Sequence, residues 1–385
     1  MVGLHVVGHL ARRALDGSPE QFQVEQLKKA ARLYEDTPGA EVKPAEMIPI
    51  VLTIILFIVL YASVRYTLGE VVSTLAMIEQ PQSTVTRQTV DADSIEPDAP
   101  LDKEEKERLI FEEEVVVKQE PLTRSIRKTI RHLHSVGGFS ARWRGLGVSA
   151  AYHLAHSLCS NFIASFFHDF AIVQAITYIV SSVLLARIHM TWTHVMISEP
   201  SPKPWFRRIV SDAGVWRALI LPSAVYATAQ MTTIGLPVIA FVTFTSGSGV
   251  ANYSQMWIGL LASVMVMLGL SLLVLLPASV TLTRIEASFL PEDETTIVPF
   301  DRTFGGAKNG SKSLFIEAWR SFDMSSRLRL IVFYVKMAAI QIMIVNVGIH
   351  AVMAETWILG MDRLSILAQS GSAQLRLAAM GVDQD

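Results

Sequence analysis

Long apolar stretches alternate with polar segments along this chain. The run 47–60, for example, contains no ionisable side chain. A helix needs about 20 mostly apolar residues to cross a bilayer, because hydrocarbon cannot satisfy its backbone groups. The pattern therefore predicts an all-α, multi-pass transmembrane helical bundle with about six spans arranged as three helix-hairpin repeats. We place the spans at 47–68, 148–167, 170–197, 218–244, 254–283 and 330–353.

The spans divide the chain into five regions. Residues 1–46 form a polar segment with a surface helix from Pro19 to Tyr34, and no cleaved signal is recognisable in them. Residues 47–147 hold the first span, an acidic connection and a basic amphipathic segment. Spans two to four occupy 148–244, spans five and six with a basic connection occupy 245–355, and the tail 356–385 lies on the membrane or in solvent. We expect kinks at the prolines within or beside the spans, which are Pro222, Pro237 and Pro277.

The composition supports membrane insertion and restricts the chemistry. The chain is 51% hydrophobic and 18% charged, whereas charged residues make up about a quarter of soluble domains. A single cysteine, Cys159, excludes an intramolecular disulfide and a cysteine-based metal cluster. The phosphate-loop, dinucleotide, zinc-protease and serine-hydrolase motifs are absent. We therefore expect no enzyme activity, no cofactor, no metal and no nucleic-acid partner, although dispersed catalytic groups of a membrane enzyme remain a third interpretation.

The connections between spans fall into two classes. Those at 168–169 and 245–253 are short, whereas those at 69–147, 198–217 and 284–329 are long and hold most of the cations. The positive-inside rule places the long connections on one side of the membrane and both termini on the other. About 46 residues then precede the first span without a secretory signal, which favours insertion into a mitochondrial membrane. The alternative is the endomembrane system, because long acidic loops weaken the rule.

The first long connection is unusually acidic. Its segment 80–120 is rich in Asp and Glu and poor in aromatic residues, so it cannot bury enough apolar surface to offset the entropy of ordering. We expect disorder through much of it. Two roles are open, a solvated linker or an acidic arm that docks a protein partner.

A Trp-Arg pair stands before or at the start of three spans. The pairs are Trp143-Arg144, Trp216-Arg217 and Trp319-Arg320. Each follows a basic segment that itself follows an earlier apolar stretch, which is typical of a three-fold internal repeat. The alternative is coincidence, because both residue types prefer membrane interfaces.

Two segments resemble motifs of the mitochondrial carrier family. Residues 138–145 (GFSARWRG) are similar to its glycine, aromatic-basic and glycine pattern, and 277–286 (PASVTLTRIE) is similar to its helix-end signature, with Pro277 and Arg284 in register. The resemblance covers roughly 45–355 and implies six spans in three repeats; we identify the chain as a degenerate, carrier-like member with uncharacterised fungal multi-pass relatives. The family's acid and base at the third and sixth signature positions are Ser279 and Leu282 here. The salt-bridge gate of a carrier therefore cannot form in this repeat.

Polar side chains inside spans are the candidates for a binding site, because they are costly in lipid. Arg187, Gln230 and Lys336 are candidates for contact with a small anionic solute, while the alternative for Arg187 and Lys336 is that they extend to the membrane surface. His153 and His156 share a helix face with Cys159 and point either into a central cavity or into helix packing. His189 and His194 belong to an interfacial belt or, alternatively, to a proton relay.

These observations predict a carrier-like integral membrane protein that binds or transports a small anionic solute. The alternative is a non-transporting membrane scaffold or assembly factor that recruits partners through its acidic loop and its termini. The expected partners are the lipid bilayer, the solute and, under the alternative, a protein.

Overall fold

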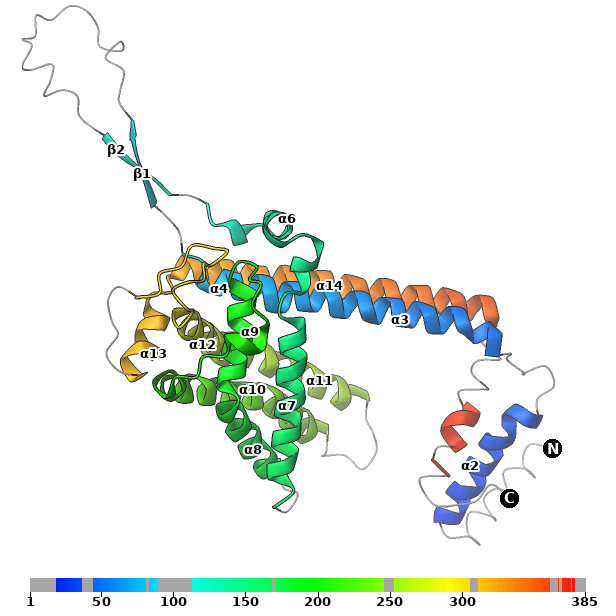
Figure 1. Ribbon diagram of the computed structural model, residues 1–385. Coiled ribbons are helices and arrows are strands. Elements are labelled where there is room, and N and C mark those ends of the chain that lie inside the picture. Colours follow the sequence, from blue (N-terminus) through cyan, green and yellow to red (C-terminus); the bar gives the residue numbers. More distant parts are fainter. Residues whose placement is uncertain are drawn as a thin grey trace, which may run out of the picture. The chain divides into compact units, whose positions relative to one another are not determined.

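The computed structural model describes eleven parts of the chain, at 19–36, 44–80, 83–88, 113–118, 120–167, 171–245, 253–304, 311–360, 366, 369–374 and 376–377. Two compact units are present, and each is described by itself. The first unit comprises 1–63 with 339–385, and the second comprises 64–338. Helices dominate both units, which confirms the all-α prediction (Figure 1).

The α-helices of the described residues have these bounds: α2 (Pro19–Asp36), α3 (Pro44–Tyr66), α4 (Ser73–Ile78), α6 (Ile126–Gly137), α7 (Leu146–Ala164), α8 (Ala171–Leu184), α9 (Ala186–Ile197), α10 (Ala213–Thr245), α11 (Tyr253–Leu270), α12 (Leu276–Ser288), α13 (Ser311–Arg320) and α14 (Met324–Leu359). The short helical turns are the π-helices η1 (Thr67–Val72) and η6 (Ser271–Leu275) and the 3₁₀-helices η3 (Leu122–Arg124), η4 (Phe139–Trp143) and η5 (Trp205–Arg208). The predicted surface helix from Pro19 to Tyr34 is confirmed as α2.

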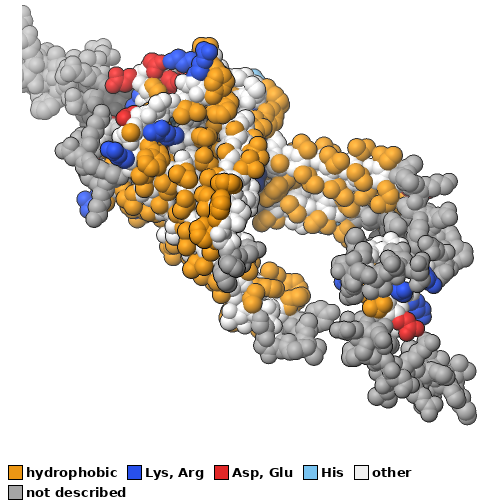
Figure 2. Space-filling view, turned by 60° about the horizontal axis from the view of Figure 1, so that its bottom comes forward, with side chains coloured by type: hydrophobic (Ala, Val, Ile, Leu, Met, Phe, Trp, Pro, Cys, Tyr) orange, Lys and Arg blue, Asp and Glu red, His pale blue; other side chains and the backbone are white. Residues whose placement is uncertain are grey.

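Four described helices are long and apolar enough to cross a membrane, which confirms the multi-pass interpretation. They are Glu46–Ile78, Ala213–Thr245, Gln255–Ser288 and Met324–Leu359, and the bent pair α8–α9 is a fifth candidate. The expected sixth span, 148–167, is a real helix of 19 residues, α7, but it is not among the candidates by length and composition. His153, His156 and Asn161 lower its hydropathy. Figure 2 shows hydrophobic side chains over much of the second unit, with charged side chains gathered towards one end.

The three odd-numbered spans are each interrupted part-way along. η1 separates α3 from α4, and η6 separates α11 from α12 directly before Pro277. The third span is bent by 61° between α8 and α9, at Leu185 and without a proline. Pro222 and Pro237, by contrast, lie inside the unbroken helix α10. Only one of the three interruptions therefore lies beside a proline. Helices also break at π-turns and where side chains compete for backbone groups.

The far halves of the broken spans, α4, α9 and α12, contact one another within the second unit. Hydrogen bonds between backbone groups then join the connections that follow them. Gln80 N–H donates to the Pro299 carbonyl at 3.0 Å, and Ile297 N–H donates to the Ile197 carbonyl at 2.8 Å. All three long connections therefore begin at one end of this unit. A buried cluster below them includes Met190, Leu219 and Ile285.

The acidic first connection contains two short strands, which the sequence did not predict. β1 (Ser83–Gln88) pairs antiparallel with β2 (Glu113–Lys118), with Val85 opposite Val116. Valine and threonine, which recur in both segments, favour extended backbone. The rest of the acidic segment, 89–112, lies outside the described residues, as do the short connections at 168–170 and 246–252.

The first unit holds both ends of the chain. Ala31 of α2 packs against Ala373 and Leu377, and Ser370 Oγ donates to the Ala31 carbonyl at 2.9 Å. Polar termini that pack together lie on one side of the bilayer, so the number of crossings is even. We therefore expect four or six crossings rather than five. Either α7 crosses as a sixth span, or α7 and the bent pair form a re-entrant segment between four crossings.

We expect epitope tags at the two ends of the chain to be digested together when protease is added to one face of sealed vesicles. The physical reason is the packing of α2 against residues 369–377. A tag between Gly137 and Ser140 serves as the internal control, because six crossings place it on the opposite face. Digestion of only one terminal tag would contradict the even count.

Candidate functional site

A buried carboxylate joins α9 to α12 in the middle of the second unit. Glu286 is fully buried. Its Oε1 accepts a hydrogen bond from His189 Nδ1 at 2.6 Å, and its Oε2 accepts one from Thr193 Oγ1 at 2.5 Å. His194 Nε2 donates to the Glu286 carbonyl at 2.7 Å. Both carboxyl oxygens therefore have hydrogen-bond partners. No role for Glu286 was predictable from the sequence.

Aromatic residues from neighbouring helices surround His189. Its ring centroid lies 5.1 Å from that of Tyr152 on α7 and 6.1 Å from that of Tyr226 on α10. Trp192, on α9 itself, lies at 5.5 Å. Helices α7 and α10 therefore converge on the Glu286–His189 pair, which joins α9 to α12, so four helices meet at this pair. His189 and His194 face the bundle interior here, so the interfacial belt expected for them is wrong.

His156 and Gln230 come close through a tyrosine that the sequence did not single out. The buried ring of His156 donates from Nε2 to the Tyr178 carbonyl at 3.2 Å and lies 2.9 Å from Ser182 Oγ. Tyr178 Oη donates to Gln230 Oε1 at 3.0 Å. His153 is exposed instead, with its ring 5.6 Å from that of Trp192. His156 therefore serves helix packing, and no group of metal ligands occurs among the described residues.

The other candidates for solute contact lie apart from this network. Arg187 donates from Nη2 to the Asp212 carbonyl at 3.1 Å, which anchors the approach to α10. Lys336 is exposed on α14 and lines a separate pocket. The residues that were expected to form one solute site, Arg187, Gln230 and Lys336, are therefore distributed over three places.

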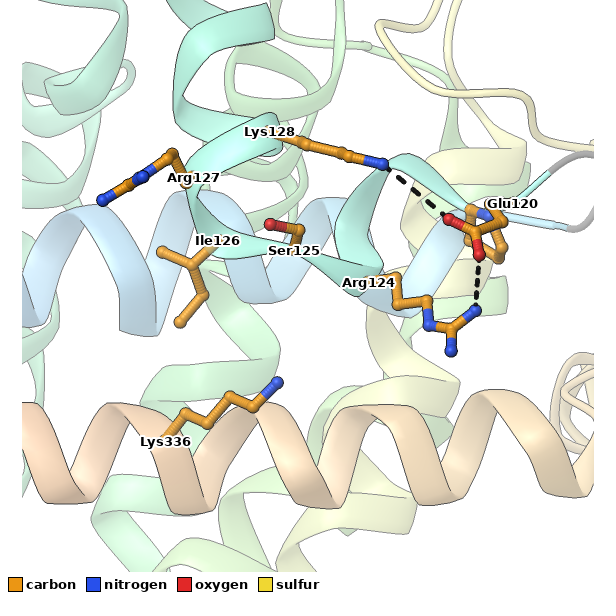
Figure 3. A pocket seen from close by; sticks show the side chains of 8 residues that line it. Glu120, Arg124, Ser125, Ile126, Arg127, Lys128 and Lys336 are labelled. Atoms are coloured by element: carbon orange, nitrogen blue, oxygen red, sulfur yellow. Dashed lines mark hydrogen bonds and ion pairs between the residues drawn. The ribbon is translucent and has the colours of Figure 1, made fainter.

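The pocket beside Lys336 is rich in cations and is called the basic pocket below. Its volume is about 370 Å³, and it is lined by Glu120, Pro121, Arg124, Ser125, Ile126, Arg127, Lys128 and Lys336. Lys336 points from α14 towards Ser125 and Arg124, as Figure 3 shows. Arg124 and Lys128 both approach Glu120, at 2.8 and 3.8 Å. Within the described part of the chain, neither Arg127 nor Lys336 has a carboxylate at ion-pair distance.

The basic pocket also contains the start of a helix. α6 begins at Ile126, and its N-cap residue Ser125 makes no side-chain hydrogen bond to the first turn. The first backbone N–H groups of a helix have no partner within it and carry a partial positive charge. Backbone donors thus lie beside the ammonium group of Lys336, which is the chemistry of an anion site.

Arg284 links helices at the end of the bundle where α4, α9 and α12 meet, and this end is called the closed end below. Arg284 is fully buried, and its guanidinium donates to three partners: the Ala318 carbonyl at 3.1 Å, the Met77 carbonyl at 3.2 Å and Ser321 Oγ at 2.8 Å. The rings of Phe300, Phe304 and Phe322 each lie 5.5 Å from its Cζ. Arg284 therefore ties α4, α12 and α13 together through backbone carbonyls. Pro277, the other signature-like residue, stands at the first turn of α12.

The three Trp-Arg pairs anchor the chain in different ways. Arg144 donates to the Val195 and Ser198 carbonyls, and burial together with the like charge of Arg208 lowers its pKa to about 10. Trp143 lies against Phe139. In the second pair Trp216 Nε1 donates to the Val183 carbonyl at 3.1 Å. In the third, the guanidinium of Arg327 stacks over the ring of Trp319 at 3.9 Å. Arg217 and Arg320 are exposed.

Two more carboxylates, whose roles were not predictable from the sequence, hold the connections. Glu79 accepts hydrogen bonds from Leu122 N–H at 2.6 Å and Thr123 N–H at 3.0 Å. Glu294 forms a two-point ion pair with Arg208, with distances of 2.5 and 3.1 Å. Glu79 links the end of α4 to residues 122–123, and Glu294 links the third long connection to Arg208 in the second. Hydrogen bonds between segments distant in sequence therefore hold this end of the bundle together.

Comparison with known proteins adds no relative: neither a model of a known protein family nor a curated protein sequence matches this chain. Two features of the structure bear on its function, the basic pocket and the bundle end closed by Arg284.

Proposed function

We propose that this protein is a carrier-like integral membrane protein that binds a small anionic solute in the basic pocket. The observation that carries the proposal is that Lys336 lies beside the uncapped start of α6, and neither has an anionic partner within the described part of the chain. Four cationic side chains and one carboxylate, Glu120, line the pocket. The local excess of positive charge favours an anion over a neutral ligand.

The geometry of the pocket restricts the class of solute. A volume of about 370 Å³ lies at the lower end of the range for small-molecule sites, about 300–1,000 Å³. Backbone N–H groups and lysine suit phosphate as well as carboxylate. Arg124 and Lys128 already approach Glu120. The donors left for a solute are therefore Lys336 and the backbone N–H groups at the start of α6. A solute with two or more negative charges therefore fits better than a monoanion.

The test is binding of inorganic pyrophosphate, as the probe, to purified protein in nanodiscs of neutral lipid. We expect Lys336→Gln to weaken binding at least about tenfold, since a hydrogen bond to a charged group contributes about 1.5–3 kcal/mol. Binding by the native protein should weaken as salt rises, because exposed charges are screened.

Arg217→Gln is the matched control, because Arg217 is exposed and lies outside the basic pocket. Equal affinities of Lys336→Gln and the native protein would overturn the proposal. A loss of affinity in both variants would assign the effect to net charge rather than to the pocket, and this too would contradict it.

A second function, a membrane scaffold without transport, is favoured by Arg284. A carrier must have two states of similar free energy, and paired charges at the mouth of a bundle can break and reform between them. Arg284 instead donates to the backbone carbonyls of Met77 and Ala318 inside the bundle, and exposing it would leave these acceptors without partners. Under this proposal the protein binds its solute without exchanging it across reconstituted liposomes, and the acidic connection holds a protein partner.

We propose a mitochondrial membrane as the location, with the endomembrane system as the alternative. The support is that three cationic connections begin at one end of the second unit, since such connections remain on the negative-potential side during insertion. Tagged protein that co-localises with endomembrane markers would refute this location.

A further inference from the structure

Four rings with polar groups form a continuous file inside the second unit. The ring centroid of Tyr178 lies 4.4 Å from that of His156, which lies 5.7 Å from that of Tyr152. Tyr152 in turn lies 5.1 Å from His189. Ser182 Oγ lies 2.9 Å from His156 Nε2 and also interacts with the hydroxyl of Tyr152. The file therefore joins α7, α8 and α9 through hydroxyl and imidazole groups, which both donate and accept hydrogen bonds.

One end of the file lies in a polar pocket near the C-terminal end of α7. The pocket has a volume of about 720 Å³. Its lining includes Ser160, Asn161, Ser165, Thr177 and Tyr178. α7 extends from Leu146 to Ala164, so it is roughly 28 Å long at a rise of about 1.5 Å per residue. Tyr152 is in the second turn of this helix, so the file extends along most of its length.

Two carboxylates act on His189, and only one of them is hydrogen-bonded. Glu286 accepts from His189 Nδ1 at 2.6 Å. Glu70 belongs to the π-helix η1 within the first membrane-spanning helix. It interacts with His189 and with the exposed Arg65 through its charge, and within the described residues its carboxyl group makes no hydrogen bond or ion pair. His189 Nε2 likewise has no hydrogen-bond partner there, and the His189 side chain is 15% exposed. Ionisable groups inside membrane bundles are costly and mark functional sites, and π-turns are frequent at such sites.

Tyr66 extends the polar groups to the side of the long connections. It stands four residues before Glu70, and the charge of Glu70 acts on it. Its hydroxyl donates to the Arg144 carbonyl at 2.8 Å and accepts from Trp192 Nε1 at 3.2 Å. Arg144 stands two residues before α7 and lines a pocket of about 310 Å³ among the long connections. Polar groups thus extend from one pocket to the other, past both ends of α7.

We propose that this file conducts protons through the second unit, with His189, Glu286 and Glu70 as its central relay. A proton that reaches Nε2 of neutral His189 forms an imidazolium, whose charge the Glu286 carboxylate balances. Release of the proton from Nε2 to Glu70 turns that carboxylate into a carboxylic acid and restores neutral His189. Only N–H and O–H bonds form and break, so the helices need not separate and the closed end at Arg284 stays intact. None of these residues lines the basic pocket, so the inference does not rest on the proposed solute site.

Proton flux into liposomes of phosphatidylcholine that contain the full-length protein tests the path. A potassium diffusion potential drives the flux, and a pH-sensitive dye inside the liposomes records it. We expect the native protein to give a flux well above that of protein-free liposomes. Glu70→Gln should reduce this flux about 100-fold or more, since a positioned acid or base accelerates proton transfer by that order. Glu292→Gln removes an exposed carboxylate and, as the matched control, should keep the native flux.

Glu70→Gln separates conduction from folding, because the carboxyl group of Glu70 holds no other described part of the chain in place. Its unfolding temperature should equal that of the native protein, and Glu70→Asp, which keeps a carboxyl group, should recover part of the flux. A native flux in Glu70→Gln, or no flux from the native protein, would overturn the proposal. So would a flux that disappears when choline replaces sodium in the buffer, because the path would then carry sodium ions.

Discussion

Arg284→Leu is expected to destabilise the protein by about 3 kcal/mol or more, because each buried acceptor left without a donor costs about 1–3 kcal/mol. The substitution orphans the carbonyls of Met77 and Ala318 and removes the bond to Ser321 Oγ. It also removes the cation from the three phenylalanine rings around it. The contacts between α4, α12 and α13 should loosen together, since one side chain holds all three.

Thermal unfolding of the purified protein in detergent measures this effect. Arg284→Lys keeps the charge but has no planar fork, so we expect it to restore only part of the stability. Arg217→Leu is the matched control, because Arg217 is exposed at the start of α10, and its unfolding temperature should equal that of the native protein. An Arg284→Leu protein as stable as this control would show that the closed end does not depend on Arg284.

Glu286→Ala is expected to cost a similar amount, about 3–5 kcal/mol, because it removes one partner of a buried pair and leaves the other unsatisfied. His189 and Thr193 would each lose their acceptor, and a cavity would form between α9 and α12. Replacing both partners is less costly than replacing one. The double variant His189→Leu with Glu286→Leu should therefore unfold at a higher temperature than His189→Leu alone or Glu286→Leu alone.

The four proteins of this double-mutant cycle give the coupling free energy between the two side chains. Glu292→Ala is the control, because Glu292 is an exposed carboxylate six residues further along the chain. Additive effects of the two single variants would mean that the 2.6 Å contact between His189 and Glu286 contributes nothing specific to stability.

The positions of most helices were predictable from the sequence, because hydropathy over about 20 residues is a local property. The predicted 218–244 lies within α10 (Ala213–Thr245), and 330–353 lies within α14 (Met324–Leu359). The bend at Leu185 was not predictable in this way, since no proline or glycine marks it. The two strands were missed because composition averages over a whole acidic segment, whereas β1 and β2 depend on a few β-branched residues and on their pairing.

The candidate site was predictable only in part. Lys336 was recognised because a cation inside an apolar stretch is rare, but two roles remained open for it, and the structure adds Arg127 and the start of α6 beside it. Glu286 went unrecognised because its partner His189 is 97 residues away in the chain. Polar residues on a helix can face lipid, a neighbouring helix or the interior, and the sequence of one helix does not distinguish these.

Hydrophobicity and charge along the chain were thus sufficient to establish a helical membrane protein with cationic connections, because the cost of burying backbone groups and charges in lipid acts on each segment by itself. Which side chains meet is different. Arg284 reaches a carbonyl 207 residues away, and that contact exists only when three helices pack. The tertiary structure alone decided the closed end at Arg284, the buried pair of Glu286 with His189, and the basic pocket. Each of these depends on groups from segments that are distant in the sequence and come together only in the folded chain.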